Sequence, residues 1–190
     1  MFCVIPLAGI MSAGENSTQD PRFTKDNELI RPANYREWIY VTSGLGMSYD
    51  AGREDADPTF DNVFVEPSAY RAFLADGKWP DKTMFVLEVR SSASHGSINK
   101  AGHFQSRLVS VEAAVKDESR FPEKWAYFSF GGPGSVRTSA KAFPKDACHT
   151  CHSKNGAVEN TFVQFYPTLL EVADAKGTLK PGYSGSAAHH

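Results

Sequence analysis

Apolar and polar residues alternate along the middle of this chain, a pattern typical of β-strands that bury one face. Phe85, Leu87 and Val89 share one side of a strand expected at residues 83–90. Val109, Val111, Ala113 and Val115 alternate in the same way within a strand expected at residues 103–116. The centre of the chain therefore predicts two long neighbouring strands.

Shorter runs of β-forming residues predict three further strands, at 38–41, 62–65 and 125–130. A stretch rich in Gly, Asp and Ser at 44–58 separates the first two as a loop, and the glycines of 131–134 end the last. Strands that follow one another with short breaks favour antiparallel pairing.

Helices are expected mainly around these strands. Pro67 opens a helix at 68–75 that Gly77 closes, and Asn34 with Glu37 three places on forms the pattern of a capping box.

A further helix is expected over 160–170, where apolar residues recur at helical spacing and Pro167 would kink or end it. These apolar residues are Phe162, Phe165, Tyr166 and Leu169. The prediction is a single α+β domain over 21–183, mainly an antiparallel β-sheet with peripheral helices.

The ends of the chain lie outside this expected domain. Residues 2–11 form an apolar run followed by small residues, as in the later part of a secretory signal, but no Lys or Arg precedes them. We expect residues 1–20 to be a signal remnant or disordered, and 184–190 to be a disordered tail.

Bulk composition excludes two classes of partner. The chain has 190 residues, a net charge of −2 and 41% hydrophobic residues, so it fits one globular domain. This charge gives no electrostatic basis for binding nucleic acid. No apolar stretch is long enough to span a bilayer.

The most informative motif is Cys148-His149-Thr150-Cys151-His152. A C-x-x-C-H run is the attachment signature of a c-type haem, because two thiols at this spacing form thioethers to one porphyrin and the next histidine meets the iron. We therefore expect one covalently attached haem c per chain, with Cys148 and Cys151 as anchors and His152 as the metal ligand. Attachment of this kind normally follows export, which predicts a periplasmic protein.

Other interpretations of the motif are weaker. A closed zinc site needs four ligands, and Cys148, Cys151 and His152 supply three without a second C-x-x-C or H-x-x-x-H. A redox dithiol is expected beside a βαβ pattern, which is missing here. Two buried structural thiols have no reason to keep this spacing.

Several blocks together resemble the cytochrome P-460 family, over residues 34–169. In chain order they are NYREW at 34–38, VEP at 65–67, DKT at 81–83, AAVKD at 113–117, RFP at 120–122, WAYFSF at 125–130, AFP at 142–144, CHTCH at 148–152 and QFYP at 164–167. The resemblance implies the cytochrome P-460 fold, a homodimer, and one haem c held by His152 with an open distal position.

The family has two functional branches, which the resemblance alone does not separate. Cytochrome P-460 itself carries a lysine cross-linked to the porphyrin and oxidises hydroxylamine and nitric oxide. Cytochrome c′-beta lacks this bond and binds nitric oxide and carbon monoxide beneath apolar caps. Where the first branch has its lysine we place Leu87, and no lysine occurs from Thr83 to Asn99.

The preferred hypothesis is therefore a five-coordinate haem protein with an apolar distal pocket for a small gaseous ligand. Candidate cap residues are Phe60, Phe64, Phe85 and Leu87. The alternative is an oxidoreductase acting on a small nitrogen compound, for which Glu159 and Asp61 are the candidate acid–base groups.

A third hypothesis is an electron carrier that serves a redox partner protein. It needs a sixth iron ligand, from His103, His95 or a methionine such as Met84. Such a ligand would close the distal position that the first two hypotheses leave open.

Overall fold

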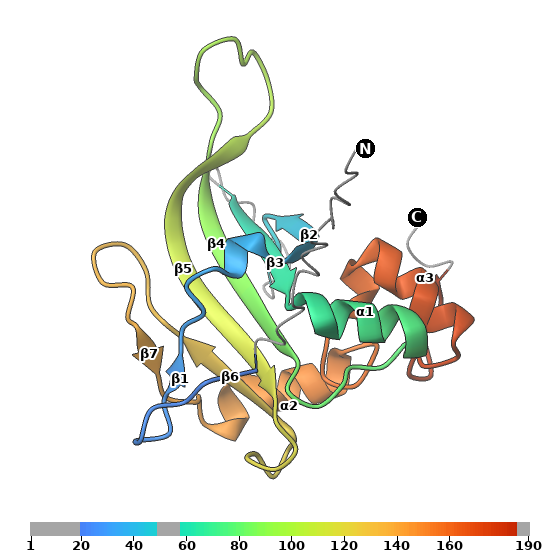
Figure 1. Cartoon of the computed structure of the whole chain (residues 1–190). Helices are drawn as coiled ribbons and strands as arrows, with labels where there is room; N and C mark the ends of the chain where they lie inside the picture. Colours follow the sequence, from blue (N-terminus) through green and yellow to red (C-terminus); the bar gives the residue numbers. More distant parts are fainter. Residues whose placement is uncertain (1–19, 49–57, 186–190) are drawn as a thin grey trace, which may run out of the picture.

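The computed structural model describes residues 20–48 and 58–185, and its centre is a five-stranded antiparallel sheet in the order β2-β3-β4-β5-β6 (Figure 1). The strands are β2 Ile39–Leu45, β3 Thr59–Val65, β4 Met84–Ala93, β5 Phe104–Lys116 and β6 Trp125–Ser129. Each strand pairs with the next in sequence, so the sheet is a meander.

Strand register sorts the side chains between two faces. Val65 lies opposite Phe85, Phe85 opposite Ala114, and Ala114 opposite Tyr127, so these four share one face. Three helices cover this face: α1 Pro67–Asp76, α2 Lys145–Asn155 and α3 Pro167–Ala175 (Figure 1). We call it the helical face.

The other face has a separate core. Met84, Val86, Val115 and Phe128 point into it from the sheet. It is covered by the 3-10 turn η1 Tyr35–Glu37 and by a small sheet of β1 Leu29–Ile30 and β7 Ser139–Ala140. The domain thus has a layer on each side of its sheet.

A buried charge cluster lies on that second face. Glu88 of β4 accepts hydrogen bonds from Tyr35 and Arg90 and pairs with Arg36. Burial alone would raise the pKa of Glu88, but these hydrogen bonds and the two arginines hold the pKa below its usual range.

Local chemistry explains the bounds of α1. Pro67 occupies the first turn, and the Glu66 carboxylate accepts hydrogen bonds from the backbone N–H groups of Ser68 and Ala69. Gly77 ends the helix with φ +67, a left-handed conformation that a side chain would strain.

The α+β prediction is confirmed, and each expected strand is present, but two helical predictions were wrong. Asn34 makes no side-chain cap hydrogen bond, so the expected capping box is not formed, and only the 3-10 turn η1 follows it. Residues 160–170 do not form one helix: a 3-10 turn η2, Val163–Phe165, precedes α3. The reason is Pro167, which begins α3 at its first turn and has no N–H to extend a helix from the preceding residues. Phe165 is 47% exposed, so it is not on a buried helical face.

The expected ends, 1–20 and 184–190, fall almost entirely outside the described residues, and their assignment stays a prediction. Within the described part of the chain, no helix is both long and apolar enough to cross a membrane.

Candidate functional site

Helix α2 brings the motif residues together on the helical face. Cys148 and His152 are four residues apart, which places them on one side of the helix, one turn from each other. Both thiols are free and half-buried, and Cys148 packs against the core beneath the helix. The thiols are therefore available for chemistry with a group that lies against the sheet.

The imidazole of His152 is held on three sides. Its ring contacts the rings of Tyr127 and Phe162, with centroid distances of 4.2 and 4.4 Å. Nδ1 is 3.0 Å from the carbonyl oxygen of Asn160. A carbonyl only accepts hydrogen bonds, so Nδ1 carries the proton and Nε2 keeps its lone pair for a metal.

Burial also keeps this ring neutral. It lowers the pKa of His152 below its ordinary value, outweighing the opposing hydrogen bond to Asn160. A neutral imidazole with an oriented Nδ1–H is the form that ligates iron.

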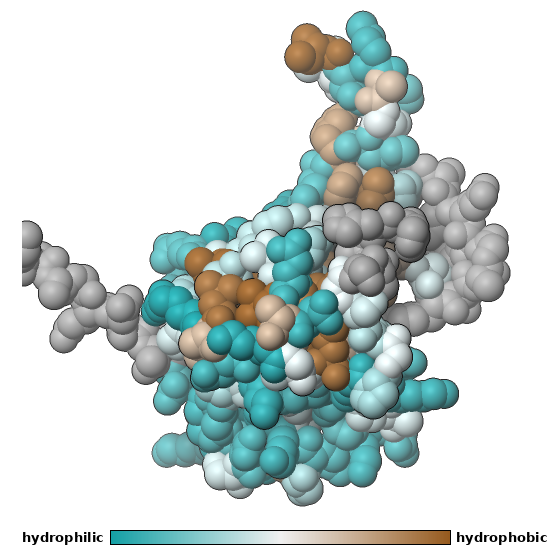
Figure 2. Space-filling model, turned by 90° about the vertical axis from the view of Figure 1, so that its right-hand side faces the viewer, coloured by the Kyte–Doolittle hydropathy of each residue, from teal (hydrophilic) through white to brown (hydrophobic). Residues whose placement is uncertain are grey.

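Beyond the helices, the sheet continues the helical face with two further rows of side chains. Val63, Leu87, Glu112 and Ser129 lie opposite one another across β3 to β6. Val63 and Leu87 are half-buried, so the row begins with apolar side chains that the helices do not fully cover. Figure 2, which views the side of α1 and α3, also shows apolar side chains gathered within a hydrophilic surround.

Two carboxyl groups lie close to the apolar pair Val63 and Leu87. Glu112 belongs to the same row, and Asp61 lies one row further on the same face. Burial raises the pKa of Asp61, and burial together with the charge of Asp61 raises the pKa of Glu112 despite a hydrogen bond from Ser110. Burial raises the pKa of Cys148, and the charge of Glu112 adds to this effect, so Glu112 lies within electrostatic range of the motif.

The four candidate cap residues separate into two groups. Leu87 lies on the helical face beside Val63 and Glu112, where a cap is expected. Phe85 is on the same face but is a core residue, 5% exposed and packed against the rings of Trp79 and Trp125.

Phe60 and Phe64 point to the opposite face. The β3–β4 pairing is regular, so alternate residues of β3 take opposite sides, and Phe64 packs on Tyr35 in the second core. The sequence pattern showed that these residues are apolar but not which face they occupy.

The candidate acid–base group Glu159 is engaged elsewhere. Its carboxylate contacts Lys116 Nζ and accepts a hydrogen bond from Trp125 Nε1, next to the turn that holds His152. Glu159 thus belongs to the turn whose Asn160 carbonyl bonds His152. Asp61, in contrast, lies on the sheet beyond Leu87.

The residues considered as a sixth ligand lie apart from the motif. Met84 is 3% exposed within the second core, on the face opposite Cys148. His95 and His103 are exposed in the hairpin between β4 and β5, which projects from the sheet (Figure 1).

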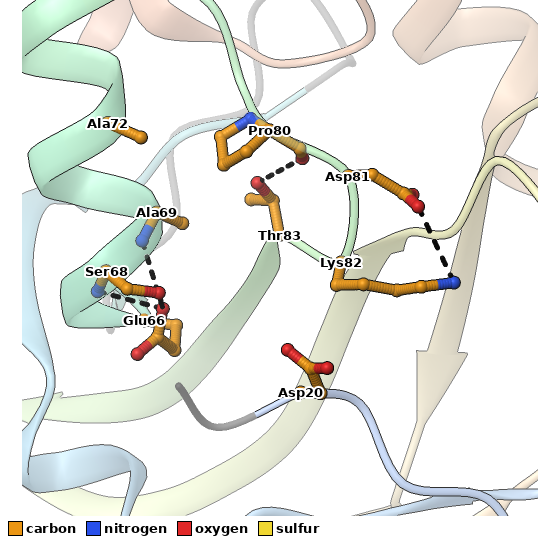
Figure 3. Close-up of a pocket in the computed structure, with 9 residues that line it drawn as sticks. All are labelled: Asp20, Glu66, Ser68, Ala69, Ala72, Pro80, Asp81, Lys82 and Thr83. Atoms are coloured by element: carbon orange, nitrogen blue, oxygen red, sulfur yellow. Dashed lines mark hydrogen bonds and ion pairs between the residues drawn. The ribbon is translucent and has the colours of Figure 1, made fainter. Parts of the chain in front are cut away.

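A separate cleft of about 270 Å³ lies between the start of α1 and the turn before β4 (Figure 3). Glu66 and Lys82 line it, and both already have partners: Glu66 caps α1, and Lys82 bonds to Asp117. The lining contains no cysteine or histidine, so the cleft is not part of this site.

Three contributors to the site were missed by sequence reasoning. Tyr127 is one of several aromatic residues in its strand, so the sequence does not single it out. Asn160 acts through its backbone carbonyl, which no side-chain pattern reveals. Glu112 did leave a signal, because it is the one acidic residue in the alternating run 103–116.

Comparison with known proteins agrees with this geometry. The family model "Cytochrome P460" matches residues 32–163, which include the sheet, α1, α2 and the C-x-x-C-H motif. No curated protein matches the chain. The fold and the C-x-x-C-H motif agree with a haem protein. The chain belongs to the cytochrome P460 family, which implies a haem cofactor.

The residues present fit such a cofactor. Two thiols that form no disulfide, a neutral histidine with an available Nε2 and a sheet surface that includes the apolar side chains of Val63 and Leu87 are donors and surroundings that suit a haem c. Among the described residues, no three His, Cys, Asp or Glu side chains converge as a metal-ion site, so the geometry offers a zinc ion no closed ligand set.

Proposed function

We propose that this protein holds one haem c covalently through Cys148 and Cys151, with His152 as its single axial ligand, and binds a small neutral gas such as nitric oxide or carbon monoxide. The observation that carries the proposal is the His152 ring, whose Nδ1–H is committed to Asn160 and whose Nε2 is left for iron beside two free thiols. The bound group supplies an iron atom with a sixth coordination position.

The sheet row beside the motif supports an apolar distal side. Leu87 lies between Val63 and Glu112 in this row, and by the family resemblance we place it where the oxidising branch has its cross-linking lysine. Lys82, just before the strand, is paired with Asp117 instead. Apolar side chains exclude water and suit a neutral diatomic ligand, which needs no charged partner.

The second candidate is an oxidoreductase acting on hydroxylamine or nitric oxide. Asp61 and Glu112 favour it, because burial raises the pKa of both carboxyl groups and a carboxyl group can accept and return protons. In that case these two side chains would take the protons released as the substrate is oxidised.

Location and assembly complete the proposal. Covalent attachment at C-x-x-C-H implies export, so we place the protein in the periplasm. By its resemblance to its family we also propose a homodimer, with a redox partner protein only in the oxidising or electron-carrying case.

Carbon monoxide binding to the ferrous protein tests the preferred function. We expect a five-coordinate, high-spin spectrum that changes on adding the gas, with no turnover of hydroxylamine. Leu87→Ala should change the gas dissociation rate, whereas Leu74→Ala, on the outside of α1, should not. A six-coordinate low-spin spectrum that ignores the gas would refute gas binding and favour electron transfer.

Hydroxylamine oxidation by the same preparation tests the second candidate. Activity that is lost in Glu112→Gln and Asp61→Asn would favour the oxidoreductase. A porphyrin cross-linked to a lysine would show that Leu87 is not at the discriminating position.

A further inference from the structure

The turn that supplies the Asn160 carbonyl is held by backbone and side-chain hydrogen bonds. Val158 and Thr161 close it with backbone hydrogen bonds, including Thr161 N to Val158 O at 3.0 Å. Thr161 also accepts from the indole N–H of Trp79 at 2.8 Å. Glu159 and Asn160 form the tip, and the carbonyl of Asn160 accepts from both His152 and Tyr127.

Glu159 occupies this tip at a conformational cost. Its φ is +50, in the left-handed region that favours glycine. A non-glycine residue keeps such a conformation only where its surroundings fix it. Its side chain therefore must contribute something that glycine could not.

That contribution is a partly buried ion pair. The two Glu159 carboxylate oxygens lie 3.0 and 3.1 Å from Lys116 Nζ, and one accepts from Trp125 Nε1 at 3.2 Å. The Lys116 side chain is 8% exposed and also donates to the Trp79 carbonyl at 2.7 Å. The end of β5, the start of β6 and the loop before β4 thus all connect to the residue next to Asn160.

We infer that the Lys116–Glu159 ion pair is a positioning device for the proximal histidine, acting through the Asn160 carbonyl. It fixes the direction of the Nδ1–H hydrogen bond and so maintains the electron donation of His152 to iron. Hydrogen bonding at Nδ1 makes an imidazole ligand more basic and lowers the reduction potential of its metal. The inference rests on the proposed haem site, but its first consequence concerns the protein without haem.

In the haem-free protein, the ion pair should hold His152 in its Nδ1–H tautomer. We expect ¹⁵N chemical shifts of the imidazole to report this tautomer in the wild-type chain and a mixture in Glu159→Gln and Lys116→Met. Glu159→Gly should show the mixture too, although glycine accepts the turn's φ without strain. Unchanged tautomers in all three variants would overturn the inference.

In the haem-loaded protein, the direction in which the reduction potential shifts distinguishes a positioning role of the ion pair from a direct effect of its charges. Removing the anion alone would raise the potential, and removing the cation alone would lower it. Weakening the hydrogen bond predicts an upward shift in both Glu159→Gln and Lys116→Met, with a lower iron–histidine stretching frequency in each. Opposite shifts in the two variants, or no shift in either, would contradict the inference.

Lys82→Met is the matched control. Lys82 pairs with Asp117, whose side chain is 6% exposed, so its loss also breaks a partly buried ion pair, but it does not contact the turn. We expect it to lower stability while leaving the tautomer, the potential and the stretching frequency unchanged. If the wild-type chain takes up no haem, the proposed function fails, while the tautomer measurement still decides this inference.

Discussion

At the residue scale, the site depends on side chains whose protonation the fold has shifted. Burial lowers the pKa of His152 and raises the pKa values of Glu112 and Asp61, so in all three it disfavours the charged form. An uncharged ligand and protonatable carboxyl groups near a predominantly apolar surface are compatible with binding a neutral gas. They also leave a route for protons should the protein oxidise a substrate.

Glu112 makes the stability of the haem-free protein depend on pH. Its pKa is higher in the folded than in the unfolded chain, so its contribution to stability is greatest below about pH 4.3, the ordinary glutamate value, and is lost as pH rises through the folded value. Glutamine does not ionise, so Glu112→Gln removes this loss of stability at higher pH. We expect its melting temperature to rise relative to wild type between pH 4 and pH 7.

Thermal unfolding followed by circular dichroism checks this expectation. Glu171→Gln, on the exposed side of α3, is the control and should track the wild type at both pH values. A Glu112→Gln variant whose advantage is larger at pH 4 than at pH 7 would show that the sign is wrong.

The residues that could be predicted from sequence are those whose own side chains carry the chemistry. The C-x-x-C-H spacing alone identifies Cys148, Cys151 and His152 as candidate site residues. Asn160 acts through a carbonyl, and the face of Phe64 depends on its register with β4, so neither was accessible without the fold.

At the element scale, the two long central strands followed from alternation and the three shorter ones from runs of β-forming residues, whereas the segment 160–170 did not follow from its helical spacing. The apolar residues of this segment lie successively in a turn, in the 3-10 turn η2 and in the first turn of α3. The helix-like spacing of apolar residues therefore arises without one continuous helix. Pro167 was the correct signal for where α3 starts.

The junction between α2 and the Asn160 turn has little room for change. A Cβ at Gly156 would lie 2.7 Å from Thr161 N and 2.8 Å from His152 O, both backbone atoms. Gly156→Ala therefore has to displace the turn, and we expect it to destabilise the protein by about 1–3 kcal/mol, the usual range for overpacking. Chemical denaturation measures this directly.

Gly44→Ala provides the comparison for that variant. Its added Cβ would meet mainly the flexible end of the Met47 side chain, which can move away. We expect Gly44→Ala to change the free energy of unfolding little and Gly156→Ala to lower it clearly. Equal changes would mean that the junction tolerates displacement.

At the scale of the whole molecule, the sheet separates two cores with different tasks. The helical face carries the motif, while the opposite face contains the buried Glu88 cluster and its arginine partners. Stability and haem chemistry are therefore expected to be separable by mutation.

Glu88→Gln tests this separation. Loss of a buried carboxylate that accepts charged hydrogen bonds is expected to cost roughly 2 kcal/mol. Because the pKa of Glu88 is lowered by the fold, its contribution is present above the ordinary carboxyl pKa and is lost as pH falls through the folded value. The variant should melt at a lower temperature at pH 7 yet keep the wild-type ferrous spectrum, and a changed spectrum would refute the independence of the two faces.

The most direct test of the central claim is the intact mass of the protein produced with a c-type haem maturation system and then fully denatured. Covalent attachment predicts one haem mass per polypeptide, retained after denaturation, with Cys148 and Cys151 closed to alkylation. A mass equal to the polypeptide alone, with both thiols alkylated, would contradict the assignment of this chain as a haem c protein.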